Sequence, residues 1–171
     1  EAAFLVAERK LGVTERRRQR FERVAEVPFT SERKMMSSIE RDHEHGDALV
    51  IVTKGAPDVL LQRCTRARVG MDVVALDDAL RARIVADVES LTDAALRTLG
   101  VAYRPLDAGE DAQGNDAMER ELIFVGTVGI IDPPRPEAAL AIQEARGAGI
   151  RVIMITGDHP RTAARIAADL G

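Results

Sequence analysis

The segment Thr53–Pro57 (Thr-Lys-Gly-Ala-Pro) places an ammonium group beside a glycine and follows a run of β-branched residues. Proline is typical of the first turn of a helix, and the N-terminal end of a helix attracts anions. Glycine lets another group approach the backbone closely. The segment therefore predicts a phosphate-binding turn between a strand and a helix. No Walker A motif is present, and an ordinary structural turn is the alternative.

A second segment, Phe29–Lys34 (Phe-Thr-Ser-Glu-Arg-Lys), places an aromatic ring among polar residues and ends in a lysine. The chain has four phenylalanines, one tyrosine and no tryptophan, so this ring is one of few flat apolar surfaces. A purine base could stack on Phe29, with Lys34 nearby for charge. The alternative is that Phe29 belongs to the core, as phenylalanine usually does.

A third segment, Val152–Asp158, is an apolar run that ends in a hydroxyl, a glycine and a carboxylate. Ligands of parallel sheets bind beyond the carboxyl ends of the strands, where the next helix directs its backbone N–H groups. Thr156, Gly157 and Asp158 therefore form a candidate phosphate site. The alternative is a plain strand-to-helix turn capped by Asp158.

The connector Asp42–Asp47 contains two histidines flanked by carboxylates, which resembles a metal site. No further histidine or cysteine lies nearby to complete a coordination shell. Gly46 and the density of polar residues indicate an exposed hairpin turn instead. We therefore assign no metal site to this connector.

The elements that must position these segments follow from hydrophobic periodicity and turn residues. An uncapped helix opens the chain, and the arginine run after it, at positions 16–18 and 20, is typical of a solvated face. The remaining expectations are an extended stretch at 24–39, a strand at 48–54 paired antiparallel with it, helices at 57–64 and 77–99, a short strand at 101–104 and a loop at 106–116.

From Leu122 onward the pattern reads strand, helix (136–148), strand (150–156) and helix (160–170), which is typical of a parallel α/β unit. The double proline after Asp132 stiffens the chain as a hinge would. The sequence thus predicts an α+β domain at 1–131, an antiparallel sheet with flanking helices, followed by an incomplete α/β Rossmann-like segment at 132–171. We expect this small second segment to be poorly ordered or packed against a neighbour.

Composition excludes several classes of function. The net charge is −4, from 24 basic and 28 acidic residues, so no positive field favours nucleic acid. The longest apolar runs are shorter than the roughly 20 residues that a bilayer requires. The single cysteine, Cys64, excludes an internal disulfide and fits a reducing compartment. We expect the chain as given to be soluble, cytosolic and monomeric.

Four phrases, Phe-Thr-Ser-Glu-Arg-Lys, Lys-Gly-Ala-Pro-Asp, Asp-Pro-Pro-Arg and Met-Ile-Thr-Gly-Asp-His, resemble P-type ATPases in order and spacing across nearly the whole chain. They look like the calcium, sodium/potassium and proton pump branches, with calcium as our first choice. In this resemblance Phe29 would stack on adenine, Glu1 would lie near it and Arg97 would reach the phosphates. The implied nucleotide pocket consists of Glu1, Phe29, Lys34, Lys54, Gly55, Ala56 and Arg97.

The resemblance also implies that Thr156, Gly157 and Asp158 would meet the transferred phosphoryl group and that Asp132 would mark the hinge. The second segment would then be haloacid-dehalogenase-like. The phosphorylated aspartate and most ligands of Mg²⁺ would lie outside this chain, on the remaining domains of a membrane pump. The chain would bind ATP on the cytoplasmic face without turnover. A non-catalytic nucleotide-binding or interaction module and a haloacid-dehalogenase-like phosphatase fragment are the alternatives.

Overall fold

The computed structural model describes residues 2–94, 96–110, 112–131, 135–156 and 160–171. Its α-helices are α1 (Ala2–Lys10), α2 (Thr14–Arg20), α3 (Pro57–Gln62), α4 (Asp78–Asp93), α5 (Pro136–Gly147) and α6 (Pro160–Asp169). Two short 3₁₀ helices, η1 (His43–His45) and η2 (Asp116–Met118), lie in connections. The strands are β1 (Phe21–Thr30), β2 (Met35–Asp42), β3 (Ala48–Gly55), β4 (Cys64–Val69), β5 (Asp72–Ala75), β6 (Arg97–Pro105) and β7 (Leu122–Ile130).

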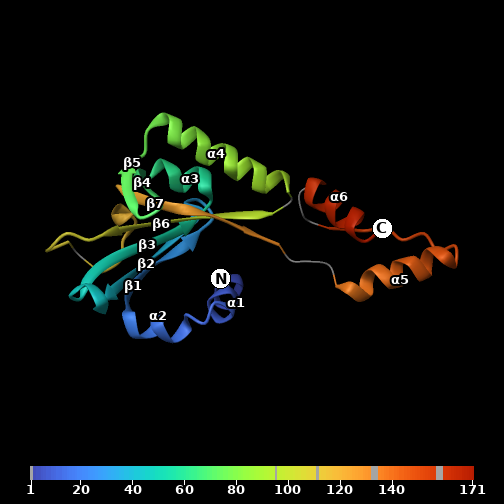
Figure 1. The fold of residues 1–171 in the computed structure, drawn as a ribbon, viewed down its shortest axis with the longest axis horizontal. Coiled ribbons are helices and arrows are strands. Elements are labelled where there is room, and N and C mark those ends of the chain that lie inside the picture. The colour runs from blue at the N-terminus through green and yellow to red at the C-terminus, as the bar shows by residue number, and fades with distance from the viewer. Residues whose placement is uncertain (1, 95, 111, 132–134, 157–159) are drawn as a thin grey trace.

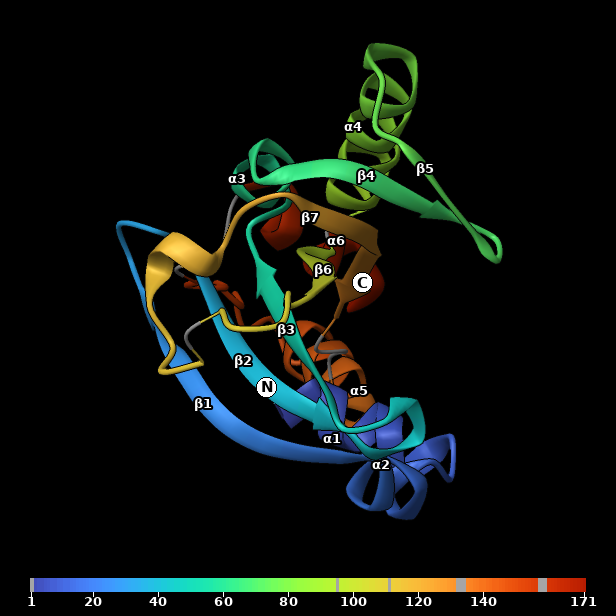
Figure 2. The same ribbon diagram turned by 90° about the vertical axis from the view of Figure 1, so that its left-hand side faces the viewer.

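The seven strands form one sheet in the order β1-β2-β3-β6-β7-β4-β5. All neighbours are antiparallel except β4 and β7, which run parallel. Helices α3 and α4 cover one face of the sheet, and α1 and α2 lie on the side of the other face, near β1 and β2 (Figures 1 and 2). The predicted α+β class, an antiparallel sheet with flanking helices, is confirmed.

The core lies between the sheet and α3, because alternate residues of each strand face the same side. On β2 and β3 the inward residues include Ile39 and Ile51, and both are fully buried in one cluster with Leu60 of α3. Burying one such side chain stabilises the fold by about 1.5–3 kcal/mol. The residues that alternate with these along the two strands, such as Ser38 and Val52, face the opposite side of the sheet, where α1 lies.

The extended stretch expected at 24–39 is two strands rather than one. Residues 31–34 form a turn, in which the Lys34 amide donates to the Thr30 carbonyl at 2.8 Å. Lys34 takes a left-handed conformation, with φ of 53°. The turn contains neither glycine nor proline, and the hydroxyl residues Thr30 and Ser31 are its only, weaker signal in the sequence. The pairing of this region with the strand at 48–54 is confirmed.

The helix expected at 77–99 ends earlier than the spacing of its apolar residues predicts. It begins as predicted, with the Asp77 carboxylate accepting from the Leu80 amide at 2.8 Å, but it ends at Asp93. Arg97 begins β6, and Leu99 pairs with Val128 of β7. Because β6 pairs with β7 from Arg97 on and with β3 from Gly100 on, its strand hydrogen bonds outweigh the helical spacing of Leu99.

Strands β4 and β5 have no counterpart among the predicted elements, and the helix expected to reach Cys64 ends at Gln62 instead. Cys64 begins β4, which pairs with β7, and Gly70 turns the chain into β5 with φ of 62°. Most side chains of β4 are polar or charged, and within this strand only Cys64 and Ala67 are buried. The strand therefore lacks the alternating apolar pattern that would predict it.

The two helices predicted after Leu122, α5 and α6, are present, and Figure 1 shows both beyond the end of β7, away from the sheet. The strand expected at 150–156 is not: these residues form no strand, and Ile153 and Ile155 are 67% and 93% exposed. Strands need hydrogen-bonded partners, and β7 pairs with β4 and β6 instead. The α/β character of this segment stays a prediction. Within the described residues no helix is sufficiently long and apolar to span a bilayer.

Candidate functional site

The candidate site lies on the sheet face opposite α3 and is organised around Lys54. Lys54 pairs with Met36 on β2 and with Val101 on β6, so the three side chains lie in one row across the sheet. Alternation along β6 places Arg97 on the same face as Val101. The two residues are four positions apart, about 13 Å at the rise of a strand. Strand pairing therefore brings Lys54 and Arg97 to one face.

Phe29 reaches this face through an irregularity in β1. Val27 pairs with Ser37 and Thr30 pairs with Met35, which leaves two β1 residues, Pro28 and Phe29, opposite Met36. The Phe29 side chain is 58% exposed, so it does not belong to the core. Two strand spacings, about 10 Å, separate Phe29 from Lys54. Met36 lies on β2 between them and contributes an apolar side chain to this face.

Lys34 and Ala56 are joined through their backbones at one end of this face. The Ala56 amide donates to the Lys34 carbonyl at 2.9 Å, which ties the β1–β2 turn to the start of α3. Pro57 occupies the first turn of α3, as predicted. Lys34 is also close to the face along the chain, because it precedes Met36 by two residues. The turn expected from Lys-Gly-Ala-Pro is confirmed as a strand-to-helix junction, and it contacts the end of the Phe29–Lys34 segment.

Gly55 makes this junction possible. A Cβ atom at Gly55 would lie 2.5 Å from the Met35 Cβ and 2.6 Å from the Lys34 carbonyl oxygen, closer than packed atoms approach. The need for glycine here is thus steric, because the β2 backbone occupies the space of a side chain. This close approach holds Lys34 and Met35 at a fixed distance from β3.

A cavity of about 390 Å³ adjoins Lys54 on the same face, under α1. The Lys54 ammonium group lies 5.7 Å from the centre of the Phe4 ring, within the range of a cation–π contact. This volume lies within the usual range for small-molecule sites. The cavity is lined by Phe4, Leu5, Glu8, Arg17, Phe21, Arg23, Ser38, Glu40, Val52, Lys54 and Val101.

Sequence reasoning missed two residues of this face, Met36 and Phe4. Met36 is neighbour to both Phe29 and Lys54 through strand pairing, and Phe4 contacts the Lys54 ammonium group. The alternation of β2 could have indicated Met36, because one of two adjacent methionines in a strand must face away from the core. Nothing in the sequence near Phe4 indicates a contact with a residue so far along the chain.

The structure does not place the remaining candidate residues on this face. Glu1, Asp132, Gly157 and Asp158 are outside the described residues. Thr156 is described and exposed, at the end of segment 150–156. The described part of the chain therefore places Lys54 and Arg97 on one face, with Phe29 beside it and Lys34, Gly55 and Ala56 at its end, and both the nucleotide and the phosphoryl roles stay predictions.

The connector Asp42–Asp47 is the turn that the sequence predicted. Residues 43–45 form η1, the Asp42 carboxylate accepts from the Glu44 amide at 3.1 Å, and Gly46 is left-handed with φ of 65°. The histidines are used locally: His45 Nδ1 lies 2.9 Å from Asp42, and His43 Nδ1 lies 2.6 Å from Asp47. Among the described residues no group of three or more histidine, cysteine and carboxylate side chains could hold a metal ion.

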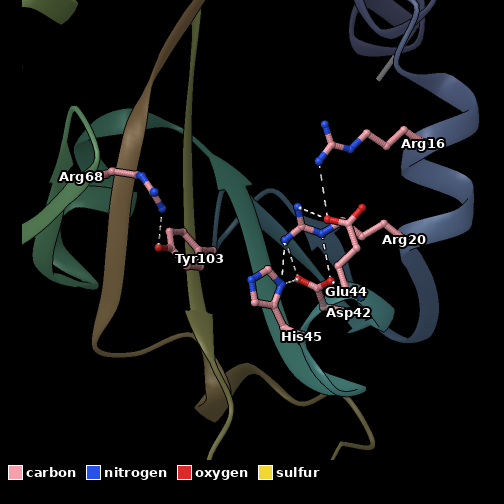
Figure 3. A network of polar contacts seen from close by, with 7 residues as sticks. All are labelled: Arg16, Arg20, Asp42, Glu44, His45, Arg68 and Tyr103. Atoms are coloured by element: carbon pink, nitrogen blue, oxygen red, sulfur yellow. Dashed lines mark hydrogen bonds and ion pairs between the residues drawn. The ribbon is translucent and has the colours of Figure 1, made fainter.

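The arginine run on α2 attaches that helix to the same turn (Figure 3). Arg20 donates to both Asp42 oxygens, at 2.9 and 2.7 Å, and contacts Glu44 at 3.3 Å. Arg16 lies 3.6 Å from Glu44 and remains largely exposed. The expectation of a solvated face is thus correct for part of the run, while Arg20 forms a bidentate pair. Through this pair α2, and α1 before it, are tethered to the β2–β3 hairpin.

The tether is expected to loosen in acid. Hydrogen bonds from Arg20, with help from His45 and the Glu44 amide, lower the pKa of Asp42 from 3.8 to about 2. A depressed carboxyl pKa stabilises the fold above the unfolded pKa, and this stabilisation is lost as the pH falls from about 3.8 towards 2. Hydrogen exchange of the α2 amides, measured between pH 2 and 5, should therefore accelerate at the acid end beyond its intrinsic pH dependence.

Arg20→Gln tests the origin of this effect. The pKa of Asp42, followed by NMR titration of its carboxyl carbon, should return towards 3.8. Arg18→Gln, an exposed arginine of the same helix, is the matched control and should leave that pKa unchanged. An unchanged pKa in Arg20→Gln would show that Arg20 does not hold Asp42 in solution.

Comparison with known proteins identifies the family. The family model described as P-type ATPase, cytoplasmic domain N, matches residues 1–137. A calcium-transporting ATPase of Bacillus subtilis (strain 168) is 44% identical over 171 residues, covering 99% of this chain and 19% of the relative. A calcium-transporting ATPase 1 of Bacillus cereus is 41% identical over 150 residues, covering 88% and 16%. The sodium/potassium-transporting ATPase subunit alpha-2 of Sus scrofa is 35% identical over 179 residues, covering 100% and 18%. The chain spans less than a fifth of the length of these relatives, and it belongs to the P-type ATPase family, in the region of the cytoplasmic domain N.

Proposed function

We propose that this chain is the ATP-binding part of a cation-transporting P-type ATPase. The observation that carries the proposal is the row formed by Met36, Lys54 and Val101 across β2, β3 and β6, with the exposed Phe29 in the β1 irregularity opposite Met36 and Arg97 on the same face. The exposed ring of Phe29 and the thioether of Met36 suit a purine base. The two cations farther along the face, Lys54 and Arg97, suit the phosphates of a nucleotide. Domain N of a P-type ATPase fits this assignment.

In the proposed complex adenine stacks on Phe29 over Met36, and the Lys34 and Lys54 ammonium groups lie beside the base and ribose. The triphosphate then runs along β6 towards Arg97, about 13 Å from Val101. Arginine suits this end because its guanidinium group binds phosphate oxygens in pairs. Gly55 and Ala56 close the pocket through their backbones, and Glu1 lies beside the base.

In the whole pump, ATP held here would be presented to an aspartate of the phosphorylation domain, and hydrolysis of the resulting phosphoenzyme would drive cation transport. We propose the domain boundary between residues 131 and 132, with the hinge at Asp132. The end of β7 at Ile130 supports this placement. Thr156, Gly157 and Asp158 would then meet the transferred phosphoryl group, with Mg²⁺ held mainly by residues outside this chain.

We further propose that the pump lies in the cell membrane with this part on the cytoplasmic side, that its partners are the remaining pump domains, and that the isolated chain is monomeric. Calcium is the proposed cation. Four relatives from Bacillus, Lactococcus and Listeria support it, since all four are named calcium-transporting ATPases. The Bacillus and Lactococcus proteins are 41–44% identical, above the 36–37% of the potassium-transporting relatives, while the Listeria protein is 34% identical.

The test is a calorimetric or NMR titration of ATP, and of AMP for comparison, into this chain and its variants. Phe29→Ala and Lys54→Ala should each weaken ATP binding about tenfold, because a stacking surface or a cation is lost. Lys10→Ala removes a lysine at the end of α1 and is the matched control, with affinity expected within about twofold of the parent. No ATP should be hydrolysed by any of these proteins.

Each outcome is decisive. Saturable binding that both site variants weaken supports the nucleotide pocket, and a higher affinity for ATP than for AMP assigns part of the affinity to phosphates. Absence of binding at millimolar ATP would overturn the proposal and favour an interaction module that keeps only the pump sequence. Turnover of ATP would point to a phosphatase-like activity of this chain.

A further inference from the structure

A buried carboxylate lies directly behind the proposed nucleotide face. Glu119, in the connection between η2 and β7, has a side chain only 1% exposed. Ser37 donates a hydrogen bond to it at 2.7 Å, and the Ser37 and Thr53 hydroxyl oxygens are 2.8 Å apart. Because the one Ser37 proton is directed at Glu119, Thr53 must donate to Ser37. These two hydroxyl residues are sequence neighbours of two residues of the face, Met36 and Lys54.

The charge of Glu119 is balanced by Arg33. The Arg33 Nη1 atom donates to both Glu119 oxygens, at 2.7 and 2.6 Å. The Nη2 atom of the same guanidinium group donates to the Pro28 carbonyl, and the Arg33 amide donates to the Thr30 hydroxyl at 3.2 Å. Arg33 therefore closes the chain on itself from residue 28 to residue 33. The segment it closes contains Phe29.

We propose that Glu119 and Arg33 are positioning residues for the nucleotide, which hold the Phe29 ring in place relative to Met36 and Lys54. The inference rests on the proposed function for its ligand. Glu119 fixes the guanidinium group, and this group in turn fixes the carbonyl that precedes Phe29. Through Ser37 and Thr53 the same carboxylate holds β2 and β3 beneath Met36 and Lys54, so one anion sets the spacing of all three.

Such a support is needed because β1 is irregular here. The register shift leaves Pro28 and Phe29 opposite one residue, and proline donates no hydrogen bond to β2. The ladder alone therefore holds Phe29 weakly, and its side chain is 58% exposed. A side chain that must stack on a base gains from a conformation fixed before the ligand arrives.

Another ion pair allows positioning to be separated from general stability. Arg104 and Glu110 form a bidentate pair at 2.7 and 3.0 Å, and Arg104 is 5% exposed. Its further partners are the Pro105 and Met118 carbonyls, not residues 28–34. Glu110→Gln thus removes a comparable ion pair without touching the Phe29 segment.

The experiment uses Phe29→Trp as the parent, since the chain has no other tryptophan. Fluorescence anisotropy of the introduced indole without nucleotide reports its order, and quenching by ATP reports affinity. Glu119→Gln should lower the anisotropy and weaken ATP binding about tenfold, as the loss of a charged hydrogen-bond partner would. Glu110→Gln should leave the affinity within about twofold, whatever its effect on the urea midpoint.

Arg33→Lys covers the case in which Glu119→Gln does not fold. Its ammonium group can pair with Glu119 but lacks the planar fork that also reaches Pro28. Lowered indole anisotropy with a nearly unchanged urea midpoint would support positioning. Unchanged anisotropy in both variants, or an equal loss in Glu110→Gln, would overturn it. If the unsubstituted chain binds no ATP in the titration described above, the proposed function fails, while the anisotropy without nucleotide still decides whether Glu119 and Arg33 order the side chain at position 29.

Discussion

Gly55→Ala is expected to destabilise the chain by about 3 kcal/mol and to remove most of its ATP binding. The added Cβ would lie 2.5 Å from the Met35 Cβ and 2.6 Å from the Lys34 carbonyl oxygen. Neither atom is the end of a flexible side chain, so the strain must move the β2 backbone. The residues that move first are Lys34 and Met35, which precede Met36 on the nucleotide face. Fold and binding are therefore expected to fail together.

Urea unfolding followed by circular dichroism measures the loss of stability, and ATP titration in the absence of urea measures the loss of binding. Gly126→Ala is the matched control: Gly126 lies in β7, and a Cβ there meets no described atom within 4 Å. Its unfolding free energy should change by less than about 0.5 kcal/mol. If Gly55→Ala kept the parental urea midpoint and ATP affinity, the β2 backbone would have room to shift, and the steric account of this glycine would be wrong.

The parts of the site that the sequence predicted are those with local signals. The β-branched run before Lys54 indicates a strand, Pro57 indicates the start of a helix, and the two together locate the junction that the structure contains. The fold class followed from the same kind of evidence. Phe29 could be chosen because an aromatic ring among polar side chains is conspicuous, and its exposure agrees with that choice.

The parts that the sequence did not predict depend on pairing between distant segments. Arg97 fell inside the helix expected at 77–99, and only its pairing with Ile130 of β7 shows that it begins a strand. Pro28 signals an edge strand or an irregularity in β1, but the register shift that brings Phe29 opposite Met36 depends on pairing with β2. Glu119 reads as one more charged residue in a polar loop, because its partner Arg33 is 86 residues away. Hydrophobic periodicity reports only local structure, so it cannot predict long-range hydrogen bonds of this kind.

The second large effect is expected for Glu110→Ala. The Arg104 guanidinium group belongs to a residue that is 5% exposed, and Glu110 holds it at 2.7 and 3.0 Å. Removing one partner of a buried ion pair leaves an uncompensated charge, which costs about 3–5 kcal/mol. Since the Glu110 side chain is 20% exposed and water can replace part of the interaction, we expect about 3 kcal/mol, the lower end of that range. Urea unfolding at pH 7 measures the loss.

The pH dependence of the unfolding free energy distinguishes the contribution of this ion pair from that of the rest of the fold. The hydrogen bond from Arg104 and that from the Asp107 amide lower the pKa of Glu110 from 4.5 to about 2. The pair therefore stabilises the parent above about pH 4.5 and loses that contribution as the pH falls towards 2. Because Glu110→Ala has no such carboxyl group, its unfolding free energy should fall less than that of the parent between pH 7 and pH 3.

Asp169→Ala is the control for the charge itself, because it breaks the exposed Arg165–Asp169 pair on α6. Exposed pairs contribute about 0.2–1 kcal/mol, so its urea midpoint should remain close to that of the parent, and its loss of stability between pH 7 and pH 3 should match the parent's. Equal effects of Glu110→Ala and Asp169→Ala would mean that Arg104 reaches water once Glu110 is removed. In that case the loop after β6 would open, and the Arg104–Glu110 pair would contribute no more than a surface contact.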